Sequence, residues 1–525
     1  MLKHTAEDEK PASVRELLEA RAAANPDKIF LFSERDGRQF SYRMFHAAVN
    51  RASAMLADNG VRKGDVVSLL MTNGAEYVIA YFACFNLGAI AGPINSLLKA
   101  EEVAYALDNS VAKVLLYSSE FAGQVSRIRG ALQSLEVAIE FEDEQKATQA
   151  YAKRGSEAPS AAGIGANGAE IRADDEAIII YTSGTTGKPK GCLLTHANLL
   201  ANARQIVEWL GFTEDDRLLT LMPLFHMNAV SVTTMSALYA GASTVVSPRF
   251  SASRFWQIIS EYEVTSFGSV ATMLSMLLAT YPEGVPDGLD TKRLRFAMCG
   301  SAPVPAEVLR RFEETFKCLV VEGYGLSEST CRSTFNPPDE RRRPGSCGRP
   351  IGNEMKVFDE DDREVPDGEL GEIVMRGENV FKGYFRNEDA TARAFRGGWF
   401  HTGDIGYRDR GGFFYIVDRK SDMIIRAGEN IYPREIDELL YSHPSVAEAA
   451  AIGVPDELYG EEVVAFVVLE AGREATEEEI IAHCRARLAD FKCPKSVHFV
   501  EALPKGPTGK VLKRELARLR RAPGN

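Results

Sequence analysis

Ala177-Ile-Ile-Ile-Tyr181 is a continuous apolar run of strand length, and Thr182-Ser-Gly-Thr-Thr-Gly-Lys-Pro-Lys-Gly191 follows it directly. Glycines allow backbone N–H groups to converge on an anion, hydroxyls add donors, and lysines bring positive charge to phosphate oxygens. We therefore expect a buried strand that ends in a phosphate-binding loop. The residues expected to contact phosphate are Thr182, Ser183, Gly184, Thr185, Thr186 and Lys190.

This loop differs from the Walker loop that many nucleotide-binding proteins share. Only two residues separate Gly184 from Gly187, and Pro189 stands where the Walker motif needs Ser or Thr beside its Lys. A flexible polar loop without a ligand is the alternative interpretation. The position of the loop directly after a buried strand favours phosphate binding.

Outward from this stretch, apolar runs of strand length alternate with segments of helical period. Residues 65–71 and 112–117 have the pattern of strands, and residues 76–87 between them have the pattern of a helix. Such alternation is typical of parallel sheets covered by helices. We therefore predict an α/β fold whose large N-terminal domain contains helix-covered, mainly parallel sheets.

The pattern changes twice toward the C-terminus. From 354 to 418, short strands with Gly and Asp-Gly turns predict a β-rich subdomain. Beyond it, amphipathic helices such as 477–488 alternate with strands such as 462–469, which predicts a small α+β domain. We expect an N-terminal domain over residues 1–418 and a mobile C-terminal domain over residues 419–525.

Composition and charge argue against several classes of protein. The 525 residues are 45% hydrophobic and carry a formal net charge of −13, which argues against a nucleic-acid partner because phosphate backbones attract basic surfaces. The longest apolar stretch, 219–246, is interrupted by polar residues, which favours a buried core over a membrane span. The eight cysteines lack CxxC spacing and the N-terminus lacks the pattern of a secretory signal, so we expect a cytoplasmic protein.

Seven further motifs accompany the phosphate loop. Together with YTSGTTGKPKG they resemble, in the same order, the motifs of the adenylate-forming superfamily, which includes acyl- and aryl-CoA synthetases, luciferases and the adenylation domains of peptide synthetases. The resemblance spans residues 13–515. The motifs are PLFHMN (223–228), CGSAP (299–303), GYGLSES (323–329), WFHTGD (399–404), DRKSDMI (418–424), AGENIYP (427–433) and PKGPTGK (504–510).

The resemblance implies a site that activates a carboxylic acid with three catalytic side chains. Lys510 would bridge the acid's carboxylate and the α-phosphate of ATP, which screens the repulsion between two anions. Glu328 would hold Mg²⁺, because this ion takes oxygen ligands and shares them with phosphates. His226 would stand at the gate between the acid and the pantetheine arm of coenzyme A.

The resemblance also assigns residues to the adenosine part of the nucleotide. Tyr324 would stack on adenine, since a planar ring suits a purine face. Asp404 would accept hydrogen bonds from the two ribose hydroxyls, and Arg419 would reach back toward the ribose. The other residues assigned to ATP or AMP are Gly300, Ser301, Ala302, Gly325 and Ser327.

The residues expected to face the acid are mostly small or apolar, which suits a compact aliphatic or aromatic acid. They are His226, Ala229, Val230, Phe267, Gly268, Gly300 and Gly323. By the same resemblance, Ala427, Gly428 and Glu429 would flank the pantetheine tunnel of coenzyme A. Ser421 takes the hinge position between the domains, where relatives commonly have Asp or Lys.

The implied activity is the ATP-dependent and Mg²⁺-dependent ligation of a small carboxylic acid to coenzyme A through an acyl-adenylate. Three alternatives stay open: a carrier protein loaded in trans, a luciferase-like oxidation of the adenylate, and a binding protein without catalysis. Besides the acid and coenzyme A, we consider two protein partners. They are a second copy of the chain in a homodimer and a protein acetyltransferase, because the PKxxxGK pattern at Lys510 resembles acetylated sites.

The motifs do not fix the acid. In its local sequence motifs the chain is most similar to the branch that contains crotonobetaine/carnitine-CoA ligase. Examples are FHMN, RRRP (341–344) and FFYIVDRKSDMI. Arg332 is a candidate to pair with a second carboxylate of the acid. A surface salt bridge is the favoured interpretation of this arginine.

Overall fold

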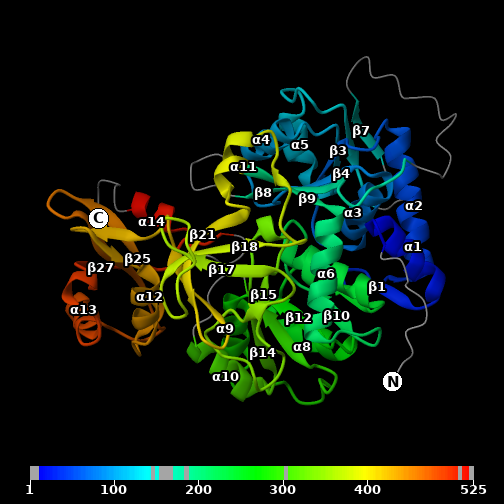
Figure 1. Cartoon of the computed structure of the whole chain (residues 1–525). Helices are drawn as coiled ribbons and strands as arrows, with labels where there is room; N and C mark the ends of the chain where they lie inside the picture. The colour runs from blue at the N-terminus through cyan, green and yellow to red at the C-terminus, as the bar shows by residue number, and fades with distance from the viewer. Residues whose placement is uncertain are drawn as a thin grey trace.

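Four sheets organise the chain in the computed structural model (Figure 1). The structure describes residues 11–142, 148–152, 169–182, 189–300, 306–506 and 511–519. In Figure 1 the C-terminal part, coloured orange to red, lies on the opposite side of the molecule from the blue N-terminal helices.

The first sheet contains the strand of the predicted phosphate loop. Its strand order is β19-β9-β8-β4-β3-β5-β6-β7, and the strands from β8 to β6 run parallel. Parallel neighbours need crossover connections, which are mostly helices here. The strands are β3 (Val66–Leu70), β4 (Ile90–Pro93), β5 (Val114–Tyr117), β6 (Val137–Glu140), β7 (Thr148–Ala152), β8 (Glu176–Thr182), β9 (Lys190–Thr195) and β19 (Gly383–Tyr384), and the helices are α3 (Ala75–Leu87), α4 (Ala100–Ser110), η1 (Ser119–Phe121) and α5 (Ala122–Ile128).

The second sheet has the order β16-β15-β14-β13-β12-β10-β11-β1-β2 and is parallel from β14 to β1. Its strands are β1 (Ile29–Ser33), β2 (Gln39–Ser41), β10 (Arg217–Thr220), β11 (Ser243–Val246), β12 (Ser266–Ser269), β13 (Phe296–Cys299), β14 (Leu319–Tyr324), β15 (Thr334–Phe335) and β16 (Arg349–Pro350). Its helices are α1 (Val14–Ala24), α2 (Tyr42–Asp58), α6 (His196–Leu210), the π-helix η2 (Asn228–Met235), α7 (Ser236–Ala240), α8 (Ala252–Glu261), α9 (Ala271–Thr280) and α10 (Ala306–Phe316). Helix α3 contacts both sheets and is buried almost all round, as an apolar helix between two sheets must be.

The β-rich subdomain and the C-terminal part each have a five-stranded sheet. The subdomain contains β17 (Glu354–Phe358), β18 (Gly371–Arg376), α11 (Glu388–Ala394), β20 (Phe395–Arg396), β21 (Trp399–Arg408) and β22 (Phe414–Arg419). The C-terminal part contains β23 (Ile424–Arg426), β24 (Glu429–Ile431), α12 (Pro433–Tyr441), β25 (Val446–Asp456), β26 (Gly460–Leu469), α13 (Glu477–Arg485), η4 (Asp490–Lys492), β27 (Ser496–Phe499) and α14 (Lys513–Leu519). Strand β22 pairs with β21, whereas β23 already pairs with β26, so the chain passes from one sheet to the other between them.

The predicted α/β fold with a smaller C-terminal domain is confirmed. The apolar stretch 219–246 lies in the core, and in the described residues no helix is both long and apolar enough to cross a membrane. The sequence did not reveal β9, which pairs antiparallel with β8. Thr182 and Lys190 are cross-strand partners, so the predicted phosphate loop connects the two strands of a hairpin.

Buried His196 makes the stability of this fold dependent on pH. The Val14 backbone N–H donates to its Nδ1 at 3.3 Å, and burial lowers the pKa of the imidazole to about 4. The unfolded chain, with a His pKa of about 6.5, binds the proton first, so stability is lost as pH falls from about 6.5 to 4. We expect this histidine to remove about 3 kcal/mol of unfolding free energy over that range.

Urea unfolding at a series of pH values checks this prediction. The variant His196→Gln keeps a hydrogen-bond acceptor and does not titrate. It should be less stable than wild type at pH 7.5 and lose less stability on acidification. Parallel pH profiles for the two proteins would contradict the assignment.

Candidate active site

Three polar side chains from three strands meet around Asp404. The Tyr324 hydroxyl donates to Oδ2 of Asp404 at 2.5 Å, and Nε of Arg419 lies 3.0 Å from Oδ1. Asp404 on β21 and Arg419 on β22 are also backbone partners, while Tyr324 ends β14 of the second sheet. The Asp404 carboxylate is 3% exposed, and its negative charge raises the pKa of Arg419. A buried carboxylate with these partners stays ionised and accepts further hydrogen bonds.

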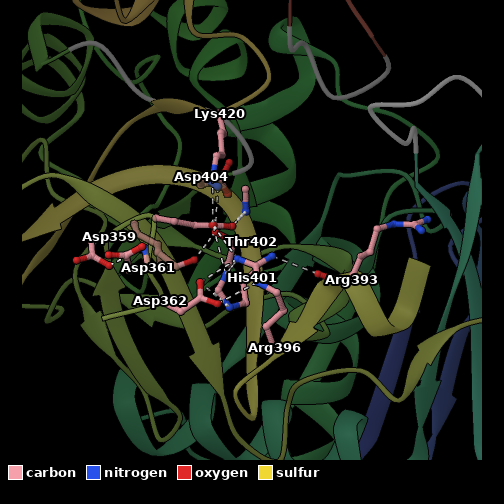
Figure 2. Close-up of polar contacts among 12 residues, drawn as sticks. Asp359, Asp361, Asp362, Arg393, Arg396, His401, Thr402, Asp404 and Lys420 are labelled. Carbon is pink, nitrogen blue, oxygen red and sulfur yellow. Dashed lines mark hydrogen bonds and ion pairs between the residues drawn. The ribbon is translucent and has the colours of Figure 1, made fainter. Parts of the chain in front are cut away.

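A hydrogen-bond network holds the segment of β21 that presents Asp404 (Figure 2). The backbone N–H of Gly403, a residue with φ of 72°, donates to the Glu372 carboxylate at 3.0 Å. The Thr402 hydroxyl donates to the Ile373 carbonyl at 2.6 Å and accepts from the Asp404 N–H at 3.0 Å. These contacts fix the direction of the Asp404 carboxylate before any ligand arrives.

Tyr384 links Glu328 to the end of the predicted phosphate loop. Its hydroxyl donates to Oε1 of Glu328 at 3.0 Å, and the Nζ of Lys190 lies 4.7 Å from the centroid of its ring. Tyr384 belongs to β19 and pairs with Cys192 of β9, so it stands next to the hairpin that carries the loop. Glu328 lies in the short helix η3 (Ser327–Ser329) and is 9% exposed.

The Glu328 carboxylate is buried in reach of the Asp404 cluster. Burial raises its pKa, whereas the Tyr384 hydrogen bond and the positive charge of Arg419 lower it. A single buried carboxylate is a poor metal site by itself, and no group of three or more His, Cys, Asp or Glu side chains forms one within the described ranges. The arrangement fits Mg²⁺ only if phosphate oxygens and water complete the coordination shell, as they usually do for this ion.

The site therefore lies where three sheets meet. Lys190 and Tyr384 come from the first sheet, Tyr324 from the second, and Asp404 with Arg419 from the β-rich subdomain. The Tyr324 ring and the Arg419 guanidinium lie beside the buried Asp404 carboxylate. The Lys190 ammonium lies over the ring of Tyr384, whose hydroxyl contacts the second carboxylate, Glu328. These groups suit the base, the ribose and the phosphates of a nucleotide.

Two family models match the chain, one on each side of Asp404 and Arg419. The model described as AMP-binding enzyme matches residues 18–385, more than half of the chain. The chain belongs to the AMP-binding enzyme family. The model of the AMP-binding enzyme C-terminal domain matches residues 435–510, and the predicted membership of the adenylate-forming superfamily is confirmed.

Relatives of this AMP-binding enzyme act on different acids. The sulfoacetate–CoA ligase of Cupriavidus necator is 37% identical over 503 residues, which cover 95% of this chain and 96% of the relative. The long-chain-fatty-acid–CoA ligase of Mycobacterium tuberculosis is 35% identical over 498 residues, covering 95% and 96%. The structure of o-succinylbenzoate-CoA synthetase of Bacillus subtilis with its acyl-adenylate intermediate superimposes with a TM-score of 0.83 at 34% identity, covering 95% of this chain and 97% of that one.

Three glycines of the AMP-binding enzyme form one face at the carboxyl ends of neighbouring strands. Gly268 of β12 pairs with Met298 of β13, and Met298 pairs with Val321 of β14. Gly300 lies two residues after Met298, and Gly323 lies two residues after Val321. Because side chains alternate along strands and paired residues face the same way, Gly268, Gly300 and Gly323 share one face of the second sheet. We call these three positions the glycine face. All three belong to the predicted acid pocket.

The structure places Phe267 away from the other predicted acid-pocket residues. It precedes Gly268 on β12 and therefore points to the opposite face of the sheet. There its ring packs edge-on against Phe255 of α8, with centroids 4.9 Å apart. This residue belongs to the core, so its assignment to the acid pocket was wrong. Ala229 and Val230 are buried in η2, which covers the glycine side.

His226 is close to the start of η2 and has an unsatisfied ring nitrogen. Its Nε2 is buried without a hydrogen-bond partner, and burial lowers the pKa of the ring to about 4. The imidazole is therefore neutral at physiological pH. A neutral ring with a free nitrogen can accept or donate one hydrogen bond to a bound ligand.

The structure also places the predicted residues of the hinge and of the coenzyme A tunnel. Ala427 and Gly428, with φ of 52° and 86°, form the exposed two-residue turn between β23 and β24, and Glu429 follows them. The Ala427 N–H donates to the Tyr459 carbonyl at 2.8 Å, a contact within the C-terminal part. Ser421 is exposed between β22 and β23. The predictions for Ser183, Gly184, Thr185, Thr186, Ser301, Ala302 and Lys510 lie outside the described residues.

Gly325 has a structural reason to be glycine. A Cβ at this position would lie 2.0 Å from the carbonyl oxygen of Cys331, so the chain after Tyr324 can fold back only with glycine here. Ser327 begins η3 and is half-buried, next to Glu328 in sequence. Thr182 is likewise half-buried at the end of β8.

Tyr384 is the functional candidate that sequence reasoning missed. In the variant Tyr384→Phe, Glu328 loses a hydrogen bond that favours its ionised form, so the pKa of Glu328 should rise. The acid limb of the pH profile of kcat/KM should then move upward by about half a unit to one unit. Initial rates of pyrophosphate release between pH 5 and 9 measure this shift.

The matched control is Tyr281→Phe, which removes a tyrosine hydroxyl that donates to the Ser253 carbonyl at 2.8 Å outside the site. Its profile should superimpose on that of wild type. A Tyr384→Phe profile that is lowered in height but not displaced would show that the hydroxyl does not act through Glu328.

Proposed function

We propose that this chain is an ATP-dependent, AMP-forming acid–CoA ligase that activates a small carboxylic acid as its acyl-adenylate. Membership of the AMP-binding enzyme family supports adenylation, with ATP and coenzyme A as co-substrates and Mg²⁺ as the metal cofactor. The single observation that carries the proposal is the Tyr324–Asp404–Arg419 cluster in reach of Glu328, because it combines a nucleoside site with a carboxylate for the metal.

In the proposed first half-reaction, a carboxylate oxygen of the acid attacks the α-phosphorus of ATP and the bond to pyrophosphate breaks. Asp404 accepts hydrogen bonds from the ribose hydroxyls, which fixes the α-phosphate relative to the acid. Lys190 and Lys510 supply positive charge where two anions must approach. Glu328 would hold Mg²⁺, which would supply further positive charge to the phosphates when bound.

In the proposed second half-reaction, the thiol sulfur of coenzyme A attacks the carbonyl carbon, the bond to AMP breaks, and the thiol proton is released. The neutral ring of His226 would position the acid's carboxylate and then face the incoming thiol. We propose that Ala427, Gly428 and Glu429 approach the pantetheine arm after the C-terminal domain turns about Ser421. The exposure of both segments supports this step.

We also propose that the domain boundary lies at the end of β22, within one residue of the expected position between 418 and 419. Strand β22 is the last one paired with the β-rich subdomain, and Ser421 lies between it and β23. The backbone N–H of Arg434 in α12 donates to the Asp418 carboxylate at 2.9 Å, which is a contact that a rotating domain must break. Acetylation of Lys510 by a protein acetyltransferase would remove its charge and stop adenylation.

Pyrophosphate release with ATP and Mg²⁺ tests the proposal, over a panel of short aliphatic, aromatic, sulfonated and dicarboxylic acids. Each acid is run with and without coenzyme A, and the products are identified by mass. We expect multiple turnovers only with coenzyme A, together with an acyl-CoA product. Release that stops after one turnover with coenzyme A present would point to a carrier protein, and oxygen consumption to a luciferase-like reaction. Absence of release with every acid would overturn the proposed activity.

A further inference from the structure

Arg332 is buried inside the molecule, where only 1% of its surface is exposed. The surface salt bridge favoured by sequence reasoning was therefore wrong. Asn202 fixes the backbone of this arginine, since its amide donates to the Arg332 carbonyl at 2.6 Å and accepts from the Arg332 N–H at 3.3 Å. The Nε and Nη2 atoms of the guanidinium are buried without any hydrogen-bond partner.

A guanidinium in this state points to a ligand. The N–H groups on Nε and Nη2 have lost water and gained no acceptor, which is unfavourable for a buried cation. The Phe335 ring lies below it, with 5.5 Å between Cζ and the ring centroid, and a cation–π contact offsets only part of the loss. An anion that enters the site would restore the missing hydrogen bonds, because guanidinium binds carboxylate or sulfonate oxygens through parallel N–H donors.

The guanidinium lies over the glycine face. A Cβ on Gly300 would be 2.6 Å from Nη2 of Arg332, and a Cβ on Gly323 would be 2.5 Å from the Phe335 ring. Over the third glycine, Oδ1 of Asn228 lies 3.0 Å from where a Cβ of Gly268 would be. Both polar atoms of the Asn228 amide are also buried without a partner. Two unsatisfied polar groups thus lie over neighbouring strands of the glycine face, which sequence analysis assigned to the acid.

We propose that Arg332 binds a second anionic group of the substrate, so that the acid is a short dianion such as a dicarboxylate or a sulfonated carboxylate. This inference rests on the proposed function, because it assumes that the glycine face receives the acid. One carboxylate is activated, and Arg332 and Asn228 hold the other anionic group. The acid pocket therefore contains Arg332 and Asn228 besides its small and apolar residues, and these two polar side chains select an acid with a second charge.

The test compares matched acids that differ by one anionic group. Malonate, succinate and sulfoacetate are paired with propionate and butyrate, and kcat/KM of the full chain is measured for each by pyrophosphate release. We expect wild type to prefer the dianions by about 100-fold or more, since a monoanion leaves the buried guanidinium unpaired. The variant Arg332→Met should lose most of that preference, and Arg332→Lys should keep part of it.

Binding is measured independently of turnover. Each acid is titrated calorimetrically into the full chain saturated with Mg²⁺ and a non-hydrolysable ATP analogue. Dianions should bind wild type and Arg332→Lys but not Arg332→Met, while the affinity for the ATP analogue should be equal in all three. The control Arg341→Met removes an exposed arginine whose partner is Asp339, 2.6 Å away, and should behave as wild type.

The outcomes separate this inference from the proposed function. If no acid releases pyrophosphate but dianions bind through Arg332, the ligase activity is wrong and the anion site stands. If acyl-CoA forms with equal preference in wild type and Arg332→Met, or monoanions are preferred, the ligase stands and the anion site is overturned. If Arg332→Met loses as much affinity for the ATP analogue as for the dianions, the arginine binds phosphate, and the proposed anion site is overturned.

Discussion

Replacing Lys510 with alanine is expected to lower the rate of adenylation by about 1,000-fold, because one positive group that screens two approaching anions is lost. The second half-reaction contains no such encounter. We therefore expect Lys510→Ala to convert a supplied synthetic acyl-adenylate and coenzyme A to thioester within about tenfold of the wild-type rate. Pyrophosphate release measures the first step and acyl-CoA formation from the adenylate measures the second.

Lys505→Ala is the matched control, since this lysine lies in the same PKGPTGK segment and pairs with Glu448 of β25. It should adenylate nearly as fast as wild type. An equal loss in both variants would assign the effect to the segment and not to the Lys510 charge. Enzymatic acetylation extends the test, because protein that mass spectrometry shows to be fully acetylated at Lys510 should lose adenylation and retain thioester formation.

Sequence patterns predicted the fold well where they repeat locally. Strand β8 reads Ala177-Ile-Ile-Ile180 and is buried on both faces, as the apolar run indicates for a strand inside a parallel sheet. Helix α3 (Ala75–Leu87) was predicted as 76–87, within one residue of its start, from the helical period of the segment. Pairing of β9 with β8 was not visible, since the sequence between them suggests a ligand loop more strongly than a turn.

The candidate site was predictable only where motifs carry the residues. Asp404, Arg419 and Tyr324 come from three motifs, and the structure brings them into direct contact. Tyr384 belongs to no quoted motif, and its contacts with residues far away in sequence leave no local pattern. Arg332 was noticed, but its burial depends on tertiary contacts such as those with Asn202 of α6 and Phe335 of β15, so sequence alone favoured the commoner surface role.

Replacing Asp404 with asparagine is expected to have the largest effect on nucleotide recognition. The amide side chain would keep the shape of the carboxylate but lose the charge that strengthens hydrogen bonds from the ribose hydroxyls, each worth about 1.5–3 kcal/mol with an ionised acceptor. The substitution also removes the negative charge that pairs with Nε of Arg419 at 3.0 Å. We expect kcat/KM for ATP to fall by about 100-fold or more, with AMP affinity falling in parallel.

Nucleotides that lack one hydroxyl make this prediction specific. Wild type should discriminate strongly against 2′-deoxy-ATP and 3′-deoxy-ATP, whereas Asp404→Asn should accept them nearly as well as it accepts ATP, because the interaction that the missing hydroxyl made is already gone. The control Asp361→Asn alters an exposed carboxylate of the same subdomain that pairs with Arg363 at 3.1 Å, and it should discriminate like wild type. Unchanged discrimination in Asp404→Asn would mean that the ribose is held elsewhere and that the buried Asp404 only anchors Arg419 and Tyr324.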